Sequence, residues 1–104
     1  MMNAEIRTDI KGIDRFISIF ESGSDPDKLH LHISEVASGT RAHPPHQHDG
    51  KEIFYVFSGE GEVVYGEKAH RLTANQAIHV DCRVLHGIRN IGDTPLRYAV
   101  IIAG

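Results

Sequence analysis

Short runs rich in Val, Ile, Phe and Tyr recur along the chain, and Gly, Pro, Asp and Asn residues separate them. No long segment shows the 3.6-residue apolar repeat of an amphipathic helix, which leaves strands as the main regular structure. Many short strands at nearly regular spacing are typical of an antiparallel sandwich or barrel. The sequence therefore predicts an all-β fold, with strands at residues 13–20, 29–36, 52–57, 62–65, 69–72, 77–80, 85–89 and 96–102.

The length of the chain, 104 residues, is enough for one modest core, and no internal repeat, linker or low-complexity segment divides it. We therefore predict a single domain over residues 1–104, with its core at about residues 13–102. The net charge is −3 and the Lys and Arg residues are scattered. This pattern argues against nucleic acid or an anionic membrane as a partner.

The sequence has no long apolar run and no basic segment followed by an apolar one at its start. We therefore expect neither a signal peptide nor a membrane span, and the expected location is the cytoplasm. Cys82 is the single cysteine, so an internal disulfide and a Cys-rich zinc site are excluded.

Histidine stands out in the composition, with eight residues. His46 and His48 lie in the stretch HPPHQHDGKEIFYVFSG, residues 43–59. In an extended segment, side chains two residues apart point to the same side, about 6.6 Å from each other. Two imidazoles can then lean together onto one ion at metal–nitrogen distances of about 2.1 Å. The alternative is a solvated, histidine-rich surface loop, and the local pattern alone does not decide between the two.

Glu52 can join this pair under one geometrical condition. If Asp49-Gly50 formed a two-residue hairpin, Glu52 would lie opposite Gln47, on the wrong face. A metal site therefore requires that the chain connects more loosely here, or crosses to a facing sheet.

The remaining histidines are weaker candidates. Pro44-Pro45 favours polyproline II, which separates His43 from His46 by about 9 Å along the axis, so we expect His43 to be a loop residue behind the ligands. In the strand at residues 29–36, the apolar residues Leu29, Leu31 and Ile33 alternate with His30 and His32. Assigning that apolar set to the core points these two histidines outward or toward a partner subunit. The histidines expected at the surface are His70 and His79.

A fourth ligand has to come from a distant part of the chain. Cys82 and His86 bracket a later loop, and His86 opens a strand in which Ile88 and Asn90 share its face. From the residues alone, His86 is only one candidate.

Two segments resemble the two motifs of the cupin superfamily. The first family motif runs G-x5-H-x-H-x3,4-E-x6-G, and residues 39–59 match it with one extra residue in the first gap. The second motif ends H-x3-N, as does the segment His86–Asn90. Upstream the chain departs from the family pattern, because Asn75 replaces a usual glycine, and Asp81 and Arg83 occupy the usual proline and glycine positions. These changes affect the turn before His86 rather than the ligand itself.

The resemblance covers about residues 29–102 and implies a small single-domain cupin, a double-stranded β-helix or jelly-roll barrel of two sheets. In such a barrel the strands on the two sides of Asp49-Gly50 belong to facing sheets, which meets the requirement on Glu52. Three neutral imidazoles and one carboxylate suit Fe, Mn, Ni, Zn or Cu better than Ca or Mg. The resemblance thus implies a divalent transition metal held by the matching positions His46, His48, Glu52 and His86.

The function inferred at this point is a metal-dependent enzyme that acts on a small organic molecule. Dioxygenase-like oxidoreductase chemistry is favoured, because no second carboxylate is placed beside the cluster for acid–base work. The alternative is a non-catalytic small-molecule-binding or sensing module, and a purely structural metal ranks last. The possible pocket-lining residues are the apolar neighbours of the cluster, Phe54, Val56, Ile88 and Cys82. Plain core packing is the alternative role for these residues.

Apolar residues also alternate to the side of the strand opposite Glu52, at Ile53, Tyr55 and Phe57. A small monomer rarely leaves so much contiguous apolar surface exposed. We therefore predict a homodimer, with the first strand pairing across subunits.

Overall fold

The computed structural model describes residues 15–17 and 29–103, and all regular structure in these residues is β-strand. The all-β prediction is confirmed, and the strands from β3 onward lie within one residue of the expected limits. No helix with the length and hydropathy needed to cross a bilayer occurs in this described part of the chain. The strands are β1 Arg15–Ile17, β2 Leu29–Val36, β3 Lys51–Ser58, β4 Gly61–Tyr65, β5 Lys68–Leu72, β6 Ala77–Asp81, β7 His86–Asn90 and β8 Leu96–Ala103.

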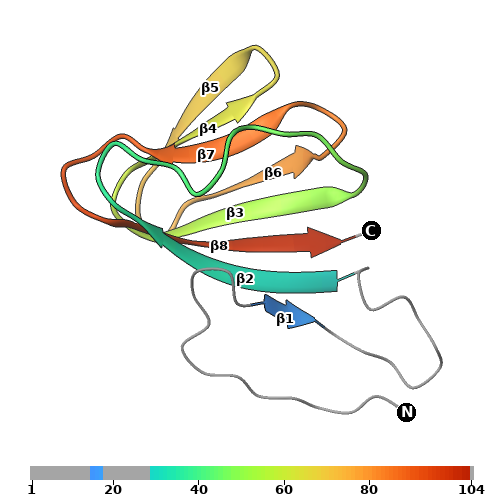
Figure 1. Ribbon diagram of the computed structural model, residues 1–104, viewed down its shortest axis with the longest axis horizontal. Helices are drawn as coiled ribbons and strands as arrows, with labels where there is room; N and C mark the ends of the chain where they lie inside the picture. Colours follow the sequence, from blue (N-terminus) through green and yellow to red (C-terminus); the bar gives the residue numbers. More distant parts are fainter. Residues whose placement is uncertain (1–14, 18–28, 104) are drawn as a thin grey trace.

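Two antiparallel sheets form the molecule. The larger has five strands in the order β1-β2-β8-β3-β6, and the smaller has three in the order β5-β4-β7. In Figure 1 the smaller sheet lies on one side of the larger one, and the two converge at one end. This is the jelly-roll sandwich that the sequence predicts. The first strand pairs with β2 of the same chain, with Phe16 opposite Leu31, and it is an edge strand of the larger sheet, so its pairing across subunits stays a prediction.

The core lies between the two sheets and follows the two-residue alternation of the strands. On β3, Glu52, Phe54 and Val56 are buried while their neighbours are not. On β8, Leu96, Tyr98 and Val100 face the same interior, as expected for side chains two residues apart on one strand. Alternate side chains point to one face of a strand, so a single face of each strand supplies the core. The buried cluster is Val36, Phe54, Val56, Val63, Leu72, Val80, Ile88, Leu96, Tyr98 and Val100.

The orientation of β2 differs from the expectation. Ser34 and Val36 are buried, and His32 lines the interior cavity described below, whereas Leu29 is 41% exposed. The assignment of Leu29, Leu31 and Ile33 to the core is therefore wrong. Both faces of this sheet carry apolar residues, and the β2 set lies on the outer face, where Leu31 is opposite Ile101 of β8. Alternation defines two faces of a strand but does not say which one is inside.

The departures from the family pattern are accommodated by local chemistry. Asn75 takes the left-handed conformation, with φ of 65°, which asparagine tolerates better than most residues that carry a Cβ. In the turn after β6, the Arg83 side chain forms an ion pair with Asp81 at 2.8 Å, and the Arg83 backbone N–H donates to the same carboxylate. These contacts close the turn without the usual proline and glycine, and they bring the chain to His86.

Candidate metal centre

The segment that carries His46 and His48 is hydrogen-bonded to the edge of β7. The backbone N–H of His46 donates to the carbonyl of His86 at 3.0 Å, and the N–H of His86 donates to the carbonyl of His46 at 3.0 Å. The N–H of His48 donates to the carbonyl of Cys82 at 2.9 Å. The backbone thus brings the first motif beside the second, although about forty residues of sequence separate them.

Gly50 marks the point at which the chain leaves this segment for the larger sheet. Its φ of 103° is open to glycine and rarely adopted by other residues, and its carbonyl accepts a hydrogen bond from the N–H of Cys82. β3 then begins at Lys51 and pairs with β6 and β8. Asp49-Gly50 is therefore a crossing between sheets and not a two-residue hairpin, so Glu52 points to the side of the histidines.

Four side chains converge at this junction: His46, His48, Glu52 and His86. Each offers one ligand atom, and these atoms all lie within 4.8 Å of one another. Nε2 of His48 is 3.5 Å from one carboxylate oxygen of Glu52, and Nε2 of His86 is 3.6 Å from the other. Burial increases across the cluster, because His46 is exposed, His48 is half-buried, and Glu52 and His86 are buried. The cluster therefore has one side toward solvent and one side in the core.

The orientations of two imidazole rings are set by backbone carbonyls. Nδ1 of His86 lies 2.8 Å from the carbonyl of Val84, and Nδ1 of His48 lies 2.8 Å from the carbonyl of Asp49. A carbonyl oxygen can only accept, so each Nδ1 carries the proton and each Nε2 keeps its lone pair. Such contacts fix the tautomer and the direction of metal-ligating histidines. Both Nε2 atoms thus face Glu52 as acceptors.

Electrostatics also suit a cation at this point. Burial lowers the pKa of His46, and the neighbouring His43, His86 and His48 lower it further, so the neutral imidazole is favoured. Burial raises the pKa of Glu52, against the opposing influence of His86 and the other imidazoles. A buried carboxylate is costly unless a positive charge accompanies it, and neutral imidazole is the form that binds metals.

These residues fit a metal ion by two observations. Nε2 of His86 is buried and makes no hydrogen bond within the described residues, which is costly for a polar atom unless something binds it. The separations are also close to what one ion needs. Two ligands on opposite sides of an ion lie at most about 4.2 Å apart at bond lengths of about 2.1 Å. Side-chain shifts of well under 1 Å would bring atoms that lie within 4.8 Å into that range.

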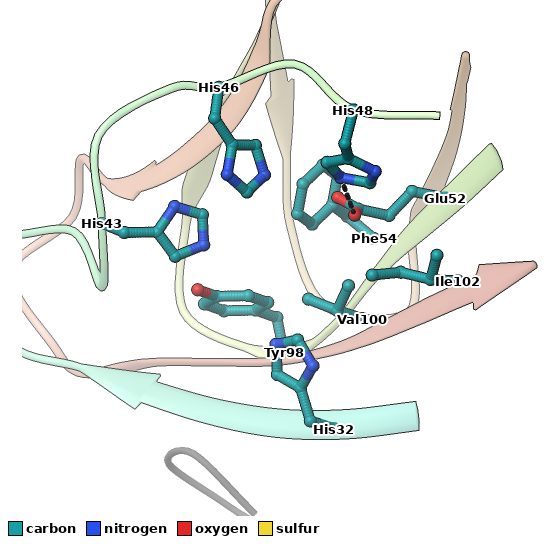
Figure 2. A pocket seen from close by; sticks show the side chains of 9 residues that line it. All are labelled: His32, His43, His46, His48, Glu52, Phe54, Tyr98, Val100 and Ile102. Carbon is teal, nitrogen blue, oxygen red and sulfur yellow. Dashed lines mark ion pairs between the residues drawn. The ribbon is translucent and has the colours of Figure 1, made fainter. Parts of the chain in front are cut away.

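A cavity of about 250 Å³ opens beside the four side chains. In Figure 2, His46 and His48 lie on one side of it and His32 and Tyr98 on the other, while Ile102 lies beside Glu52, its partner across β3 and β8. Phe54 is the one sequence-predicted pocket residue in this lining. Val56 and Cys82 are fully buried away from it, and Ile88 packs in the core cluster. The lining consists of His32, His43, His46, His48, Glu52, Phe54, Tyr98, Val100 and Ile102.

Two further histidines line the cavity beside the ligand cluster. His43 stacks on His46 with ring centroids 4.6 Å apart, and its Nδ1 contacts the carbonyl of Pro44 at 3.0 Å. It is a cavity residue beside the ligand cluster and not a member of it. His32, expected to point outward, lines the cavity instead. The two-residue spacing of His30 and His32 was a signal for it, but the face of β2 was assigned incorrectly.

Comparison with known proteins identifies the family. The profile of the cupin domain family matches residues 32–102, which is well over half of the chain. The chain belongs to the cupin family. A search of curated proteins finds no match to it.

Solved structures share this cupin fold at low sequence identity. A cupin protein from Bacteroides fragilis is similar with a TM-score of 0.67 and 19% identity, over 73% of this chain and 65% of that one. A protein described as a predicted oxalate decarboxylase, from Thermotoga maritima, is similar with a TM-score of 0.65 and 22% identity, over 86% and 78%. An oxalate oxidase in complex with the substrate analogue glycolate is similar with a TM-score of 0.68 and 21% identity, over 79% of this chain and 45% of that one. These likenesses support the fold alone.

Proposed function

We propose that this cupin binds one divalent transition-metal ion through His46, His48, Glu52 and His86 and acts as a metal-dependent enzyme on a small organic molecule. The observation that carries the proposal is the convergence of the four ligand atoms within 4.8 Å at the rim of a cavity. Three imidazoles and one carboxylate suit Fe, Mn, Ni, Zn or Cu better than the all-oxygen sites of Ca or Mg. When bound, such an ion supplies a Lewis acid and a point at which substrate and oxygen can be held.

The residues around the cluster favour dioxygenase-like chemistry over hydrolysis or epimerisation. Glu52 is the only carboxylate among the described residues that line the cavity, and in this proposal it is already used as a metal ligand. Reactions that need a dedicated acid–base pair would require a second such group. The apolar side chains of Phe54, Val100 and Ile102 limit water around a bound molecule, which strengthens its polar contacts.

The alternative is a small-molecule-binding or sensing module without turnover, since a fold does not decide between the two. Two of the structural neighbours are named for oxidation or decarboxylation of oxalate, which is a small chelating acid. At 22% and 21% identity this likeness supports the fold alone, so the choice between enzyme and sensor depends on the turnover test below. The remaining expectations stay predictions: a single domain over residues 1–104, a cytoplasmic location, a homodimer, and neither nucleic acid nor membrane as a partner.

The metal site is tested by elemental analysis of protein purified without added metal or a metal-binding tag. We expect about one transition-metal ion per chain, and less than a tenth of that in Glu52→Gln and His86→Gln. The exposed residue His79 supplies the control, His79→Gln, which should keep the wild-type content. Metal at 1,000 times its Kd should stabilise the wild type by about 4 kcal/mol, because a ligand that binds only the folded state adds RT ln(1 + [L]/Kd). Equal metal content in all four proteins would refute the site.

Turnover is tested separately on the metal-loaded protein. Oxygen uptake with enols, diketones, catechols and thiols should rise with at least one class, and the rise should be absent in Glu52→Gln. Tight binding of one of these compounds without any oxygen uptake or product would favour the sensor.

A further inference from the structure

His32 is a polar side chain on the wall of the cavity away from His46 and His48. His32 of β2 lies opposite Val100 of β8, and Val100 lies opposite Phe54 of β3. His32 is therefore level with Phe54, with β8 between β2 and β3. Phe54 is two residues along β3 from Glu52. With strands about 4.8 Å apart and about 6.6 Å per residue pair, the Cα atoms of His32 and Glu52 are about 12 Å apart. Figure 2 shows the His32 ring across the cavity from His46 and His48.

The surface between these two polar ends is apolar. Val100 and Ile102 of β8 and Phe54 of β3 lie along it, and all three line the cavity. The hydroxyl of Tyr98, also in the lining, is hydrogen-bonded to Ser34, which is its partner across β2 and β8. The cavity thus has the ligand cluster at one end and the imidazole of His32 at the other, with the side chains of Phe54, Val100 and Ile102 between them.

The size and charge of this cavity restrict what can fill it. Its volume of about 250 Å³ lies below the range of roughly 300–1,000 Å³ typical of sites for drug-sized molecules, so it suits a small metabolite. A divalent ion held by Glu52 leaves one positive charge, because the imidazole ligands are neutral. Buried charge is costly unless it is paired, so the chelating end of the occupant should be a monoanion. Lys and Arg are absent among the described residues of the lining, and the imidazole of His32 lies across the cavity from His46 and His48, where the far end of the occupant would reach.

We propose that His32 is a specificity-determining residue that hydrogen-bonds the end of the substrate remote from the metal. The substrate class is a short oxyacid with a chelating 2-hydroxy- or 2-oxocarboxylate head and a second hydrogen-bonding group a few carbons away. This inference rests on the proposed metal site and adds the choice of ligand to it.

The test compares two probes on the metal-loaded protein by isothermal titration calorimetry. L-Malate and L-2-hydroxybutanoate share the 2-hydroxycarboxylate head and the four-carbon chain, and they differ in a carboxylate or a methyl group at the far end. We expect the wild type to bind malate at least tenfold more tightly. His32→Phe keeps a ring of similar size and removes both nitrogens, so the ratio of the two Kd values should fall to within about threefold.

Further variants make the outcome specific to position 32. His32→Leu is a second variant without a hydrogen-bonding group, for use if His32→Phe does not fold. His32→Gln keeps a hydrogen-bonding group and should retain part of the malate preference. His79→Leu, a change at an exposed position on β6 of the same sheet, should leave the ratio unchanged.

Metal content is measured on each sample first, and this separates the two proposals. Protein that holds no metal at the cluster overturns the proposed function. Metal-loaded protein overturns the inference about His32 alone in three cases: if neither acid binds, if the wild type does not prefer malate, or if the preference persists in the variants without a hydrogen-bonding group.

Discussion

Cys82 shows how its surroundings set the reactivity of a single residue. Its side chain is fully buried, and its backbone N–H and carbonyl are both bonded to the segment that carries His48. Burial, together with the nearby carboxylates of Glu52 and Asp81, raises the pKa of the thiol to about 11. The thiolate is the reactive form of cysteine, so both access and ionisation are reduced. Cys82 therefore acts as a small apolar side chain that packs beneath the site.

We expect Cys82 to react slowly with a thiol reagent such as 5,5′-dithiobis(2-nitrobenzoic acid) in the folded protein at pH 8. A pKa near 11 instead of 9.0 lowers the thiolate fraction at that pH by about 100-fold, before any effect of access. The rate should increase as the pH approaches 11, and one thiol per chain should react at once in denaturant. Rapid reaction of the native protein at pH 8 would show that Cys82 is open to solvent.

At the scale of elements, the site depends on close contact between β7 and the segment before His46. Gly87 lies in β7, between His86 and Ile88, and it faces Pro45. A Cβ atom built on Gly87 would lie 3.1 Å from the Cα of Pro45 and 3.3 Å from two further atoms of its ring. The absence of a side chain at Gly87 therefore lets the two backbones pair through His46 and His86.

Gly87→Ala should weaken metal binding by about 10- to 100-fold, the range seen when groups that position metal ligands are altered. The added methyl group has to displace Pro45, and this displacement moves His46 relative to His86. Competition with a chromophoric chelator measures the affinity.

The matched control is Gly61→Ala in β4. A Cβ atom there would lie 3.2 Å from the side-chain ends of Ile88 and Leu96, within the core. This variant should lower the thermal stability and keep the wild-type metal affinity. Equal affinities for Gly87→Ala and the wild type would show that the contact with Pro45 does not position the ligands.

The sequence was sufficient to predict most strands, whereas the crossing at Gly50 was only a condition for the metal site that the family resemblance met. Sequence reasoning failed where a choice depended on distant parts of the chain. Residues 29–36 alternate clearly, but the inner face of β2 is decided by its position in the sheet, where Ser34 pairs with the buried Tyr98 of β8. His86 could be named only by family resemblance, because no local spacing reveals that it pairs with His46. His43 lies beside the ligands without belonging to them, as expected, although the polyproline geometry of Pro44-Pro45 did not indicate that its ring stacks on His46.

At the scale of the whole molecule, the outer face of the larger sheet carries a continuous apolar patch. Its central row runs across three strands, where Leu31 is opposite Ile101 and Ile101 is opposite Ile53. Ile53 is 36% exposed and Phe57 is 38% exposed, and the guanidinium of Arg97 lies over the Phe57 ring. Such a patch on a small protein favours association with another surface. This outer-face patch consists of Leu31, Ile33, Ile53, Tyr55, Phe57 and Ile101.

We expect two copies of the chain to associate through the outer-face patch. Light scattering at micromolar concentration should give twice the chain mass of 11.5 kDa, and Ile53→Glu should give the mass of one chain. A charge in the centre of the patch would have to be buried without a partner, which is costly. Ile91 is similarly exposed, at 37%, but it lies outside the patch, so Ile91→Glu should remain dimeric. A wild type with the mass of a single chain would remove this prediction.

The crossing at Gly50 has one further consequence, for how the protein behaves when the supply of metal changes. His46 and His86 belong to one layer of the sandwich and Glu52 to the other, so an ion shared by them would be a removable cross-link between layers. The metal-bound protein should be most rigid at that end of the sandwich, and the metal-free protein should be most flexible there. Proteases cleave regions that open locally, so the rate at which an added protease cleaves the chain would follow the availability of its ion.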